Sequence, residues 1–348
     1  MKKFLALILT LAMALSLAAC GGDSGSSAPA DGGQQQSQPA DSGSDTQPAD
    51  SGDEAYNISV ILKTTASEYW SYVVAGAEAY GKEHPNVTVN VKGATSETAY
   101  DEQLNMIETD MNNGDIDGYV IAPLQADMVT TIIAGQTKPI VAVDTDIDAP
   151  EVLSFVGTGN EAAAKLGGEA AAKLAKERGW EEIKCIEICG VQGDSTNEAR
   201  KAGYKAGIEA AGGTFLEDET QYANAEANQA VACMEAIMQN HPEGIAVICA
   251  NNDDMAMAAA RTAAGNEAYK NTVFLGFDGI QSACNSILAG EETMSVCQEG
   301  YNMGYESVAS VVRALQGETL DEFVDAGASI VDPDNAQARL EELQGYLA

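Results

Sequence analysis

The chain has 348 residues, of which 53 are acidic and 18 are basic, so its formal net charge is −35. A chain this acidic offers no basic patch that could neutralise phosphates, and we therefore exclude nucleic acid as a partner. The length is more than one compact core usually holds, which favours two domains.

The first 20 residues predict export from the cytoplasm. A basic start, Met1-Lys2-Lys3, precedes the apolar run Phe4–Leu15, which is short for a membrane-spanning helix and typical of a signal peptide. The small residues before Cys20 resemble a bacterial lipobox, which implies a signal peptide over 1–19 and lipidation of Cys20. An ordinary signal peptide cut before an unrelated cysteine is the alternative. Acyl chains on Cys20 would anchor the protein to the outer face of the cell membrane.

Residues 20–54 predict a disordered tether. After Cys20 they are mostly Gly, Ser, Asp, Gln, Ala and Pro, with no aromatic and no large aliphatic residue. Such a segment buries too little apolar surface to fold. From residue 55 the composition becomes globular, and the remaining 294 residues suit two domains of ordinary size.

From residue 55 onward, strand and helix patterns alternate. The predicted strands are Tyr56–Leu62, Val87–Val91, Gly118–Ala122, Ile140–Val143, Val152–Val156, Ile183–Ile188, Ile245–Cys249, Val273–Phe277 and Thr293–Cys297. The predicted helices include Ser67–Glu83, Glu97–Asn113, Glu161–Arg178, Ser195–Ala211, Ala225–Asn240, Asp253–Ala264 and Pro333–Leu347, the last with Pro333 in its first turn. Continuous apolar strands separated by helices indicate an α/β fold with two doubly wound parallel-sheet domains.

Four predicted strands lead directly into polar and acidic clusters. These clusters are Asp144–Asp146, Gly190–Ser195, Asn251–Asp254 and Asp278-Gly279. In open parallel sheets, ligands bind outside the carboxyl ends of the strands. The pattern therefore predicts a binding cleft, although Asp and Asn at such positions also cap helices and turns.

The sequence contains no recognisable catalytic or metal-binding set. Gly157–Ala162 fits the pattern G-x-G-x-x-A, but no acidic residue clearly ends the next strand, and we interpret it as a tight turn into a helix. Walker, nucleophile-elbow and His-Glu-x-x-His motifs are absent. The seven cysteines include no Cys-x-x-Cys pair, so we expect buried thiols rather than zinc ligands; whether any of them pair stays open. We predict a binding protein with no enzyme activity, metal or cofactor.

The order of motifs over residues 56–331 resembles the ribose/galactose-type periplasmic sugar-binding proteins, the substrate-binding lipoproteins of ABC importers. The resemblance rests on Ser67–Trp70, Ile140–Asp144, Glu198–Tyr204, Asn251–Ala256 and Gly276–Gly279. It implies a periplasmic binding protein type I fold with a multi-strand hinge. The implied lobes are 55–159 plus about 299–325, and 160–298 plus about 326–348.

The resemblance also implies a set of ligand-binding residues. They are Tyr69, Trp70, Asp144, Thr145, Arg200, Asn252, Asp278 and Gln298. By pattern alone, Trp70 fits a core position as well as a sugar-stacking one, because it shares a helical face with apolar residues. Arg200 fits a solvated helix position as well as a bidentate contact with hydroxyls.

Two departures from ribose binders argue against ribose itself. Thr145 stands where those proteins carry Arg. The second-lobe aromatic position falls near Ala225, with Tyr222 the nearest substitute. An expected acidic rim of Asp146, Asp253 and Asp254 leaves room for an amino sugar or another cationic polyol.

We predict a lipid-anchored monomer that captures a small carbohydrate and delivers it to the permease subunits of an ABC transporter. A sensory protein that feeds a receptor kinase is the alternative within the same class. A sugar-responsive repressor shares this core fold, but it would need an N-terminal helix-turn-helix where this chain has a signal and a tether.

Overall fold

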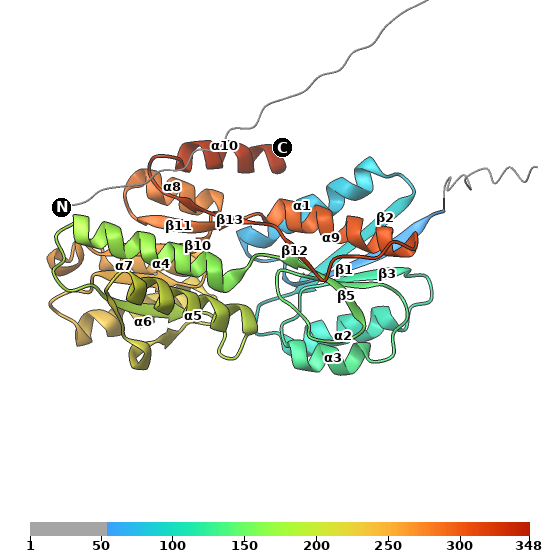
Figure 1. Cartoon of the computed structure of the whole chain (residues 1–348), viewed down its shortest axis with the longest axis horizontal. Coiled ribbons are helices and arrows are strands. Elements are labelled where there is room, and N and C mark those ends of the chain that lie inside the picture. The colour runs from blue at the N-terminus through green and yellow to red at the C-terminus, as the bar shows by residue number, and fades with distance from the viewer. Residues whose placement is uncertain (1–53) are drawn as a thin grey trace, which may run out of the picture. The chain divides into compact units, whose positions relative to one another are not determined.

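The computed structural model describes residues 54–348, which form two α/β lobes (Figure 1). The predicted signal peptide, Cys20 and the tether up to residue 53 lie outside the described residues.

The first lobe is built from alternating strands and helices. Its elements in the first half of the chain are β1 (Tyr56–Thr64), α1 (Glu68–Glu83), β2 (Val87–Ala94), α2 (Tyr100–Met111), β3 (Gly118–Ile121), α3 (Ala126–Ile133), β4 (Ile140–Val143) and β5 (Val152–Gly157). The chain returns to this lobe later with α9 (Gly300–Leu315) and β12 (Phe323–Asp325).

The second lobe repeats the pattern. Its elements are α4 (Asn160–Glu177), β6 (Lys184–Cys189), α5 (Ser195–Ala210), β7 (Thr214–Phe215), η1 (Glu217–Glu219), β8 (Gln221–Tyr222), α6 (Ala227–Asn240), β9 (Val247–Ala250), α7 (Asp253–Ala263), η2 (Glu267–Tyr269), β10 (Val273–Asp278), α8 (Gln281–Ala289) and β11 (Met294–Gln298). After β12 the chain comes back to add β13 (Ala328–Val331) and α10 (Ala336–Tyr346).

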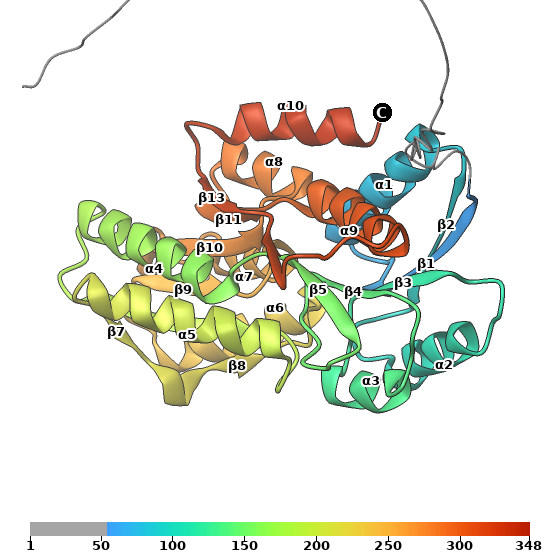
Figure 2. The ribbon, with the colours of Figure 1, turned by 45° about the vertical axis from the view of Figure 1, so that its right-hand side comes forward.

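The strand order shows how the two sheets are connected. The first sheet runs β12-β5-β4-β3-β1-β2, and the second runs β13-β11-β10-β9-β6-β7, with β8 also paired to β6. The chain passes between the lobes after β5, after β11 and after β12 (Figure 2). Every strand pair is parallel except β11 with β13, so one edge of the second sheet departs from the all-parallel prediction.

Helices cover both faces of each sheet, which explains why the strands are apolar along their whole length. In β1, Ile58, Val60 and Leu62 face the core cluster that includes α1 and α9, whereas Ile61 faces the cluster of α2 and α3. In the second lobe, α4 and α5 cover one face and α6 and α7 cover the other.

Close helix packing in the first lobe depends on glycine. A Cβ atom at Gly76 of α1 would clash with the backbone oxygen of Tyr301, and one at Gly304 of α9 would clash with that of Val73. These two glycines therefore let α1 and α9 touch backbone to backbone. Since α9 follows β11 of the second lobe, this contact ties the returning chain to the first lobe.

The structure corrects two details of the predicted elements. The last helix begins at Ala336, so Pro333 precedes the helix instead of occupying its first turn. The short strands β7, β8, β12 and β13 had no strong sequence signal, because each spans only two to four residues. Within residues 54–348, no helix combines the length and apolar character that crossing a membrane requires.

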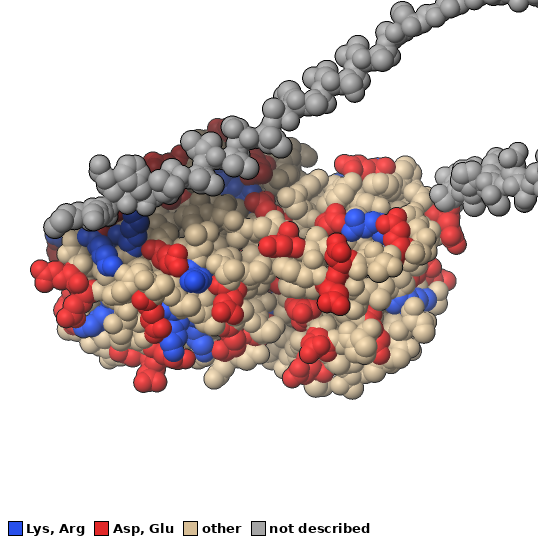
Figure 3. Space-filling view, in the orientation of Figure 1, with Lys and Arg blue, Asp and Glu red and all other residues tan. Residues whose placement is uncertain are grey.

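Acidic side chains are spread over both lobes on the face drawn in Figure 3, and basic ones are scattered among them. No continuous basic surface forms on that face in the coloured part of the chain. The distribution follows from the excess of 53 acidic over 18 basic residues.

Candidate ligand-binding cleft

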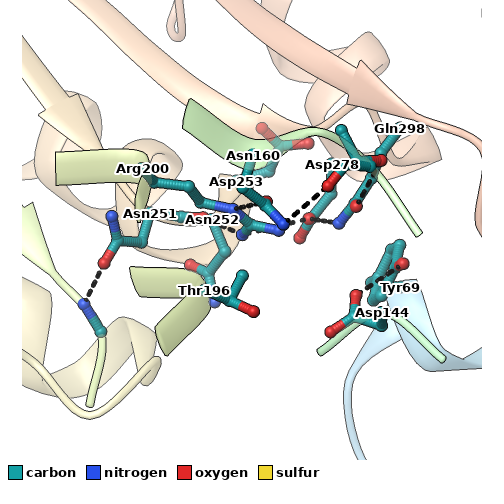
Figure 4. Close-up of polar contacts among 12 residues, drawn as sticks. Tyr69, Asp144, Asn160, Thr196, Arg200, Asn251, Asn252, Asp253, Asp278 and Gln298 are labelled. Carbon is teal, nitrogen blue, oxygen red and sulfur yellow. Dashed lines mark hydrogen bonds and ion pairs between the residues drawn. The ribbon is translucent and has the colours of Figure 1, made fainter. Parts of the chain in front are cut away.

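A cleft opens at the carboxyl ends of the strands and is lined by residues of both lobes. Its empty space is about 420 Å³, the solvent at its mouth included. Seven of the eight predicted ligand-binding residues line it: Tyr69, Trp70, Asp144, Arg200, Asn252, Asp278 and Gln298. Figure 4 shows that Asp144 and Tyr69 lie across from the group around Arg200 and Asp278.

The backbone is strained at three positions that line the cleft. Asp144 directly follows β4 and has φ 63°, Asp278 ends β10 with φ 120°, and Ala225 has φ 61°. Non-glycine residues at positive φ are uncommon and gather at functional sites, because only the surrounding structure can hold them there. The strain supports this cleft as the functional part of the fold.

Asp144 lies on the first-lobe side of the cleft, where two neighbouring side chains fix its position. Its side chain is buried and accepts hydrogen bonds from Tyr69 Oη at 2.9 Å and from Thr145 Oγ1 at 3.0 Å. Burial, helped by the negative charge of Asp144, raises the pKa of Tyr69 well above its usual value, so the phenol stays a donor. The carboxylate can still accept bonds from a ligand.

Trp70 belongs to both the core and the cleft. Its side chain is buried in the first-lobe core cluster, and its ring also lines the cleft. It meets Tyr69 edge to face, with ring centroids 5.2 Å apart, and donates Nε1–H to Glu97 Oε1 at 3.2 Å. The two interpretations of Trp70 are therefore compatible.

Arg200 projects from the second turn of α5 into the cleft, so the interpretation of a solvated helix residue is wrong. It is 5% exposed and donates to Asn160 Oδ1 at 2.8 Å and to the backbone oxygen of Asn251 at 2.6 Å. Its guanidinium lies 3.7 Å from the centroid of the Phe277 ring. These contacts fix the orientation of the guanidinium while one edge faces the cleft.

Asp278 faces Arg200 and Gln298. Gln298 Nε2 donates to Asp278 Oδ1 at 2.7 Å, and Arg200 Nη1 lies 3.8 Å from the same oxygen. Burial raises the pKa of Asp278 well above its usual value, although Arg200 acts in the opposite direction. A ligand hydroxyl that donates to this carboxyl would compensate part of the cost of burying it.

Asn252 and Thr145 have structural partners of their own. Asn252 caps α7 by accepting from the backbone N–H of Met255 at 2.9 Å, as the capping interpretation predicted, and it also lines the cleft. Thr145 does not line the cleft. Its hydroxyl lies 2.9 Å from that of Thr196, which belongs to the second lobe, so the pair links the two lobes.

The sequence interpretation missed a buried ion pair between the lobes. Lys63 Nζ, at the end of β1, lies 2.6 Å from Asp194 Oδ2 before α5, and both side chains are about 5% exposed or less. Burial alone would lower the pKa of Lys63, but Asp194, Glu97 and Asp144 outweigh burial and raise it. Burial would raise the pKa of Asp194, but Lys63 outweighs burial and lowers it. Both groups therefore stay charged.

A signal for Lys63 was present in the sequence. A lysine directly after the apolar run Val60–Leu62 is unusual for a buried strand and indicates a nearby acidic partner. Asn160, by contrast, lies in the Gly157–Ala162 stretch that we interpreted as a turn, and nothing local indicated its bond to Arg200.

Two expectations about the cleft are wrong. Tyr222 does not replace the missing aromatic, because it does not line the cleft and its hydroxyl accepts from Lys201 Nζ at 3.4 Å. The acidic rim does not form, because Asp253 is fully buried and neither Asp146 nor Asp254 lines the cleft. The cleft therefore has no acidic rim of these three residues that would favour an amino sugar.

Among residues 54–348, no group of three or more His, Cys, Asp or Glu side chains is placed to hold a metal ion. The six cysteines of this part of the chain are all free. Five of them are buried, as expected for thiols that act as small apolar side chains.

Two lobes with a polar cleft at the strand ends are typical of a solute-binding protein. The chain belongs to the periplasmic binding protein family, because residues 58–319 match its "Periplasmic binding protein domain". Membership confirms the resemblance, the fold class and the prediction of a non-enzymatic binding protein.

Two relatives illustrate the similarity. The chain is 29% identical over 276 residues to the D-ribose/D-allose-binding protein of Pseudomonas aeruginosa, covering 75% of this chain and 83% of the relative. It is 23% identical over 329 residues to the ribose import binding protein of Bacillus subtilis, covering 94% and 97%.

Solved structures give the same fold. A carbohydrate transporter solute-binding protein of Agrobacterium radiobacter, in complex with D-arabinose, aligns with TM-score 0.75 and 25% identity over 83% of this chain and 98% of its own. An ABC transporter solute-binding protein of Mycobacterium smegmatis with bound glycerol aligns with TM-score 0.72 and 26% identity, covering 82% and 96%.

Proposed function

We propose that this protein captures a small neutral monosaccharide in the cleft and delivers it to the permease of an ABC importer. The observation that carries the proposal is the opposition of Asp144 with Tyr69 in one lobe to Arg200 with Asp278 in the other, around one cavity. Carboxylates accept from sugar hydroxyls, and a fixed guanidinium donates to them. The relatives that bind D-ribose, D-allose and D-arabinose support the same ligand class.

The charges of the cleft favour a ligand without net charge. Lys63 and Arg200 each lie beside an acidic side chain, Asp194 at 2.6 Å and Asp278 at 3.8 Å, and Glu97 and Asp144 also line the cleft. An anionic or cationic ligand would have to break one of these pairs, whereas a polyol can bond to both members of a pair. We assign ligand contact to the seven predicted residues that line the cleft and add Lys63.

The lobes, residues 55–159 plus about 299–325 and residues 160–298 plus about 326–348, then act as two bodies that close over the sugar. The Lys63–Asp194 and Thr145–Thr196 contacts join them at the cleft. A ligand that contacts both lobes binds the closed form better than the open one, and this difference drives closure. The permease would recognise the closed form.

Anchoring completes the proposed function. Acylation of Cys20 would keep the protein beside its permease at the outer face of the cell membrane, with residues 20–54 as tether. One protein copy holds a complete cleft, so a monomer suffices for binding.

Intrinsic fluorescence offers a direct test. The chain has two tryptophans, and only Trp70 lines the cleft, while Trp180 donates to the backbone oxygen of Asn271 elsewhere in the second lobe. In a Trp180→Phe variant, D-ribose, D-allose and D-arabinose are titrated while emission is recorded. We expect a saturable change with at least one sugar.

A thermal-shift series provides the control. Sugar at a hundred times its dissociation constant should stabilise the protein by about 2.7 kcal/mol and raise the melting temperature. Amino acids of similar size should leave both emission and melting temperature unchanged. A response to amino acids alone, or to no sugar in a wide panel, would contradict the proposal.

A further inference from the structure

Two buried acidic side chains meet behind the cleft. Asp253 begins α7 and is 0% exposed, and Glu292 lies just before β11 and is 1% exposed. A Cβ atom at Gly276 of β10 would clash with both Asp253 Oδ1 and Glu292 Oε1. The two carboxyl groups therefore converge over the bare backbone of Gly276, and a larger residue there would separate them.

The carboxyl group of Glu292 is buried, and within residues 54–348 no donor forms a hydrogen bond with either of its oxygens. Two ionised carboxylates this close in a buried site would repel each other, while one proton between them forms a hydrogen bond. In agreement, burial, with the charge of Asp253 adding to it, raises the pKa of Glu292 well above its usual value. Burial raises the pKa of Asp253 to about 7.

Asp253 in turn holds the loop that carries Asp278. The backbone N–H of Ile280 donates to Asp253 Oδ2 at 3.1 Å, and Ser295 Oγ donates to Oδ1 at 2.5 Å. The same Ser295 Oγ accepts from the backbone N–H of Gly279 at 3.1 Å. Figure 4 shows Asp253 next to Asp278, whose φ of 120° needs such support.

We propose that Asp253 and Glu292 share one proton, and that this proton holds loop 278–280 in the conformation that directs Asp278 into the cleft. Both are positioning residues, because they act through the loop and do not line the cleft. The effect on ligand affinity rests on the proposed function, whereas the shared proton and the held loop do not.

Other titratable groups face this pair from every element packed against it. They are Asp254 and Arg261 of α7, Asp278 of β10, Cys284 of α8, Cys297 of β11 and Tyr204 of α5. Arg261 is the cation that acts on Glu292, and its own salt bridge is to Glu291, so the proton remains the direct link between Asp253 and Glu292.

Removal of the proton at high pH should loosen the loop. Two adjacent carboxylates would repel, and Asp253 would turn away from Ser295 and Ile280. A variant Glu292→Gln can donate its amide to Asp253 without titrating, so its loop should stay held at high pH. The matched control is Glu291→Gln, since Glu291 is exposed and pairs with Arg261 at 2.9 Å.

Hydrogen exchange of the full-length, ligand-free protein tests the held loop. Exchange rates of the Gly279 and Ile280 amides are measured from pH 6 to 9.5 and corrected for the intrinsic effect of pH. We expect their protection to fall by up to about tenfold per pH unit above the pKa of the pair in the wild type and in Glu291→Gln. In Glu292→Gln the protection should stay within about threefold over the same range.

Equal pH profiles in wild type and Glu292→Gln would overturn the proposal, as would a flat wild-type profile on its own. If Glu292→Gln does not fold, Asp253→Asn serves instead, because its amide can donate to Glu292 while its oxygen accepts from the loop.

The dissociation constant for D-ribose or D-allose, measured over the same pH range, gives the binding readout. It should rise at high pH in parallel with loop exchange in the wild type and not in Glu292→Gln. If the exchange of the loop amides depends on pH while the dissociation constant does not, the proposed link between the loop and ligand binding is wrong. Failure of every sugar to bind would count against the proposed function and leave the loop result standing.

Discussion

The buried pair Lys63–Asp194 makes a specific prediction about closure. In Asp194→Asn, the side chain can still accept from the backbone N–H of Asn197, as Asp194 does at 3.0 Å, so the cap of α5 is kept. What is lost is the negative charge 2.6 Å from Lys63 Nζ. The change therefore isolates the ion pair between the lobes.

The expected loss of sugar affinity follows from the buried position of the Lys63 ammonium group. A hydrogen bond to a charged group contributes about 1.5–3 kcal/mol, and removing one partner of a buried pair can cost still more. Glu97 and Asp144 remain near Lys63 and offset part of the loss. Because Lys63 and Asp194 belong to different lobes, we expect opening of the cleft to hydrate Lys63, so the penalty should affect closure and not folding. We expect sugar affinity to fall about tenfold to a hundredfold.

Calorimetric titration with the sugar found in the screen measures the effect, and thermal unfolding without sugar measures stability. The control is Glu217→Gln, which removes an exposed ion pair with Lys205 at 2.5 Å and should change neither quantity appreciably. Unchanged affinity in Asp194→Asn would refute the reasoning. A large loss of ligand-free stability with unchanged affinity would show that the pair serves folding instead.

Three further predictions concern single residues. Asp144→Ala should weaken sugar binding by roughly tenfold to a hundredfold in calorimetry, because a charged acceptor is lost, and unchanged affinity would remove Asp144 from the site. Cys20→Ser should release the protein from the membrane fraction or leave its precursor uncut, and normal processing with membrane retention would disprove lipidation. Burial raises the pKa of Glu187 to about 8 from its usual 4.5. The folded state therefore keeps a proton that the unfolded state has lost, so between pH 4.5 and 8 stability falls as pH rises. Glu187→Gln should make this fall in melting temperature shallower, because the other buried carboxyl groups with raised pKa values remain, and identical slopes in the variant and the wild type would contradict the prediction.

The periodic pattern of the chain predicted the fold well, because strands covered on both faces must be apolar throughout. The predicted strand Ile140–Val143 has the observed bounds, and Val273–Phe277 differs from β10 by one residue. The antiparallel pairing of β13 could not be predicted, since a strand of four residues at a sheet edge carries little pattern.

The residues that line the cleft could be predicted from the sequence to the extent that recognisable motifs contain them. Strand-end Asp144 and Asp278 stand where a parallel sheet places its ligand, and the structure brings them to one cavity. Contacts between residues that are distant in the sequence could not be predicted. The Lys63–Asp194 contact, for example, joins residues 131 positions apart. Only the folded chain shows that Asp253 points into the core toward Glu292 and not to the rim.

The ligand should be held between the lobes, in contact with both. Hydrogen exchange of the full-length protein with and without a saturating monosaccharide tests this claim. We predict added protection on both sides of the cleft, around residues 63–70 and 144–145 in one lobe and 194–200 and 278–280 in the other. Tight binding with protection confined to one lobe would contradict the claim.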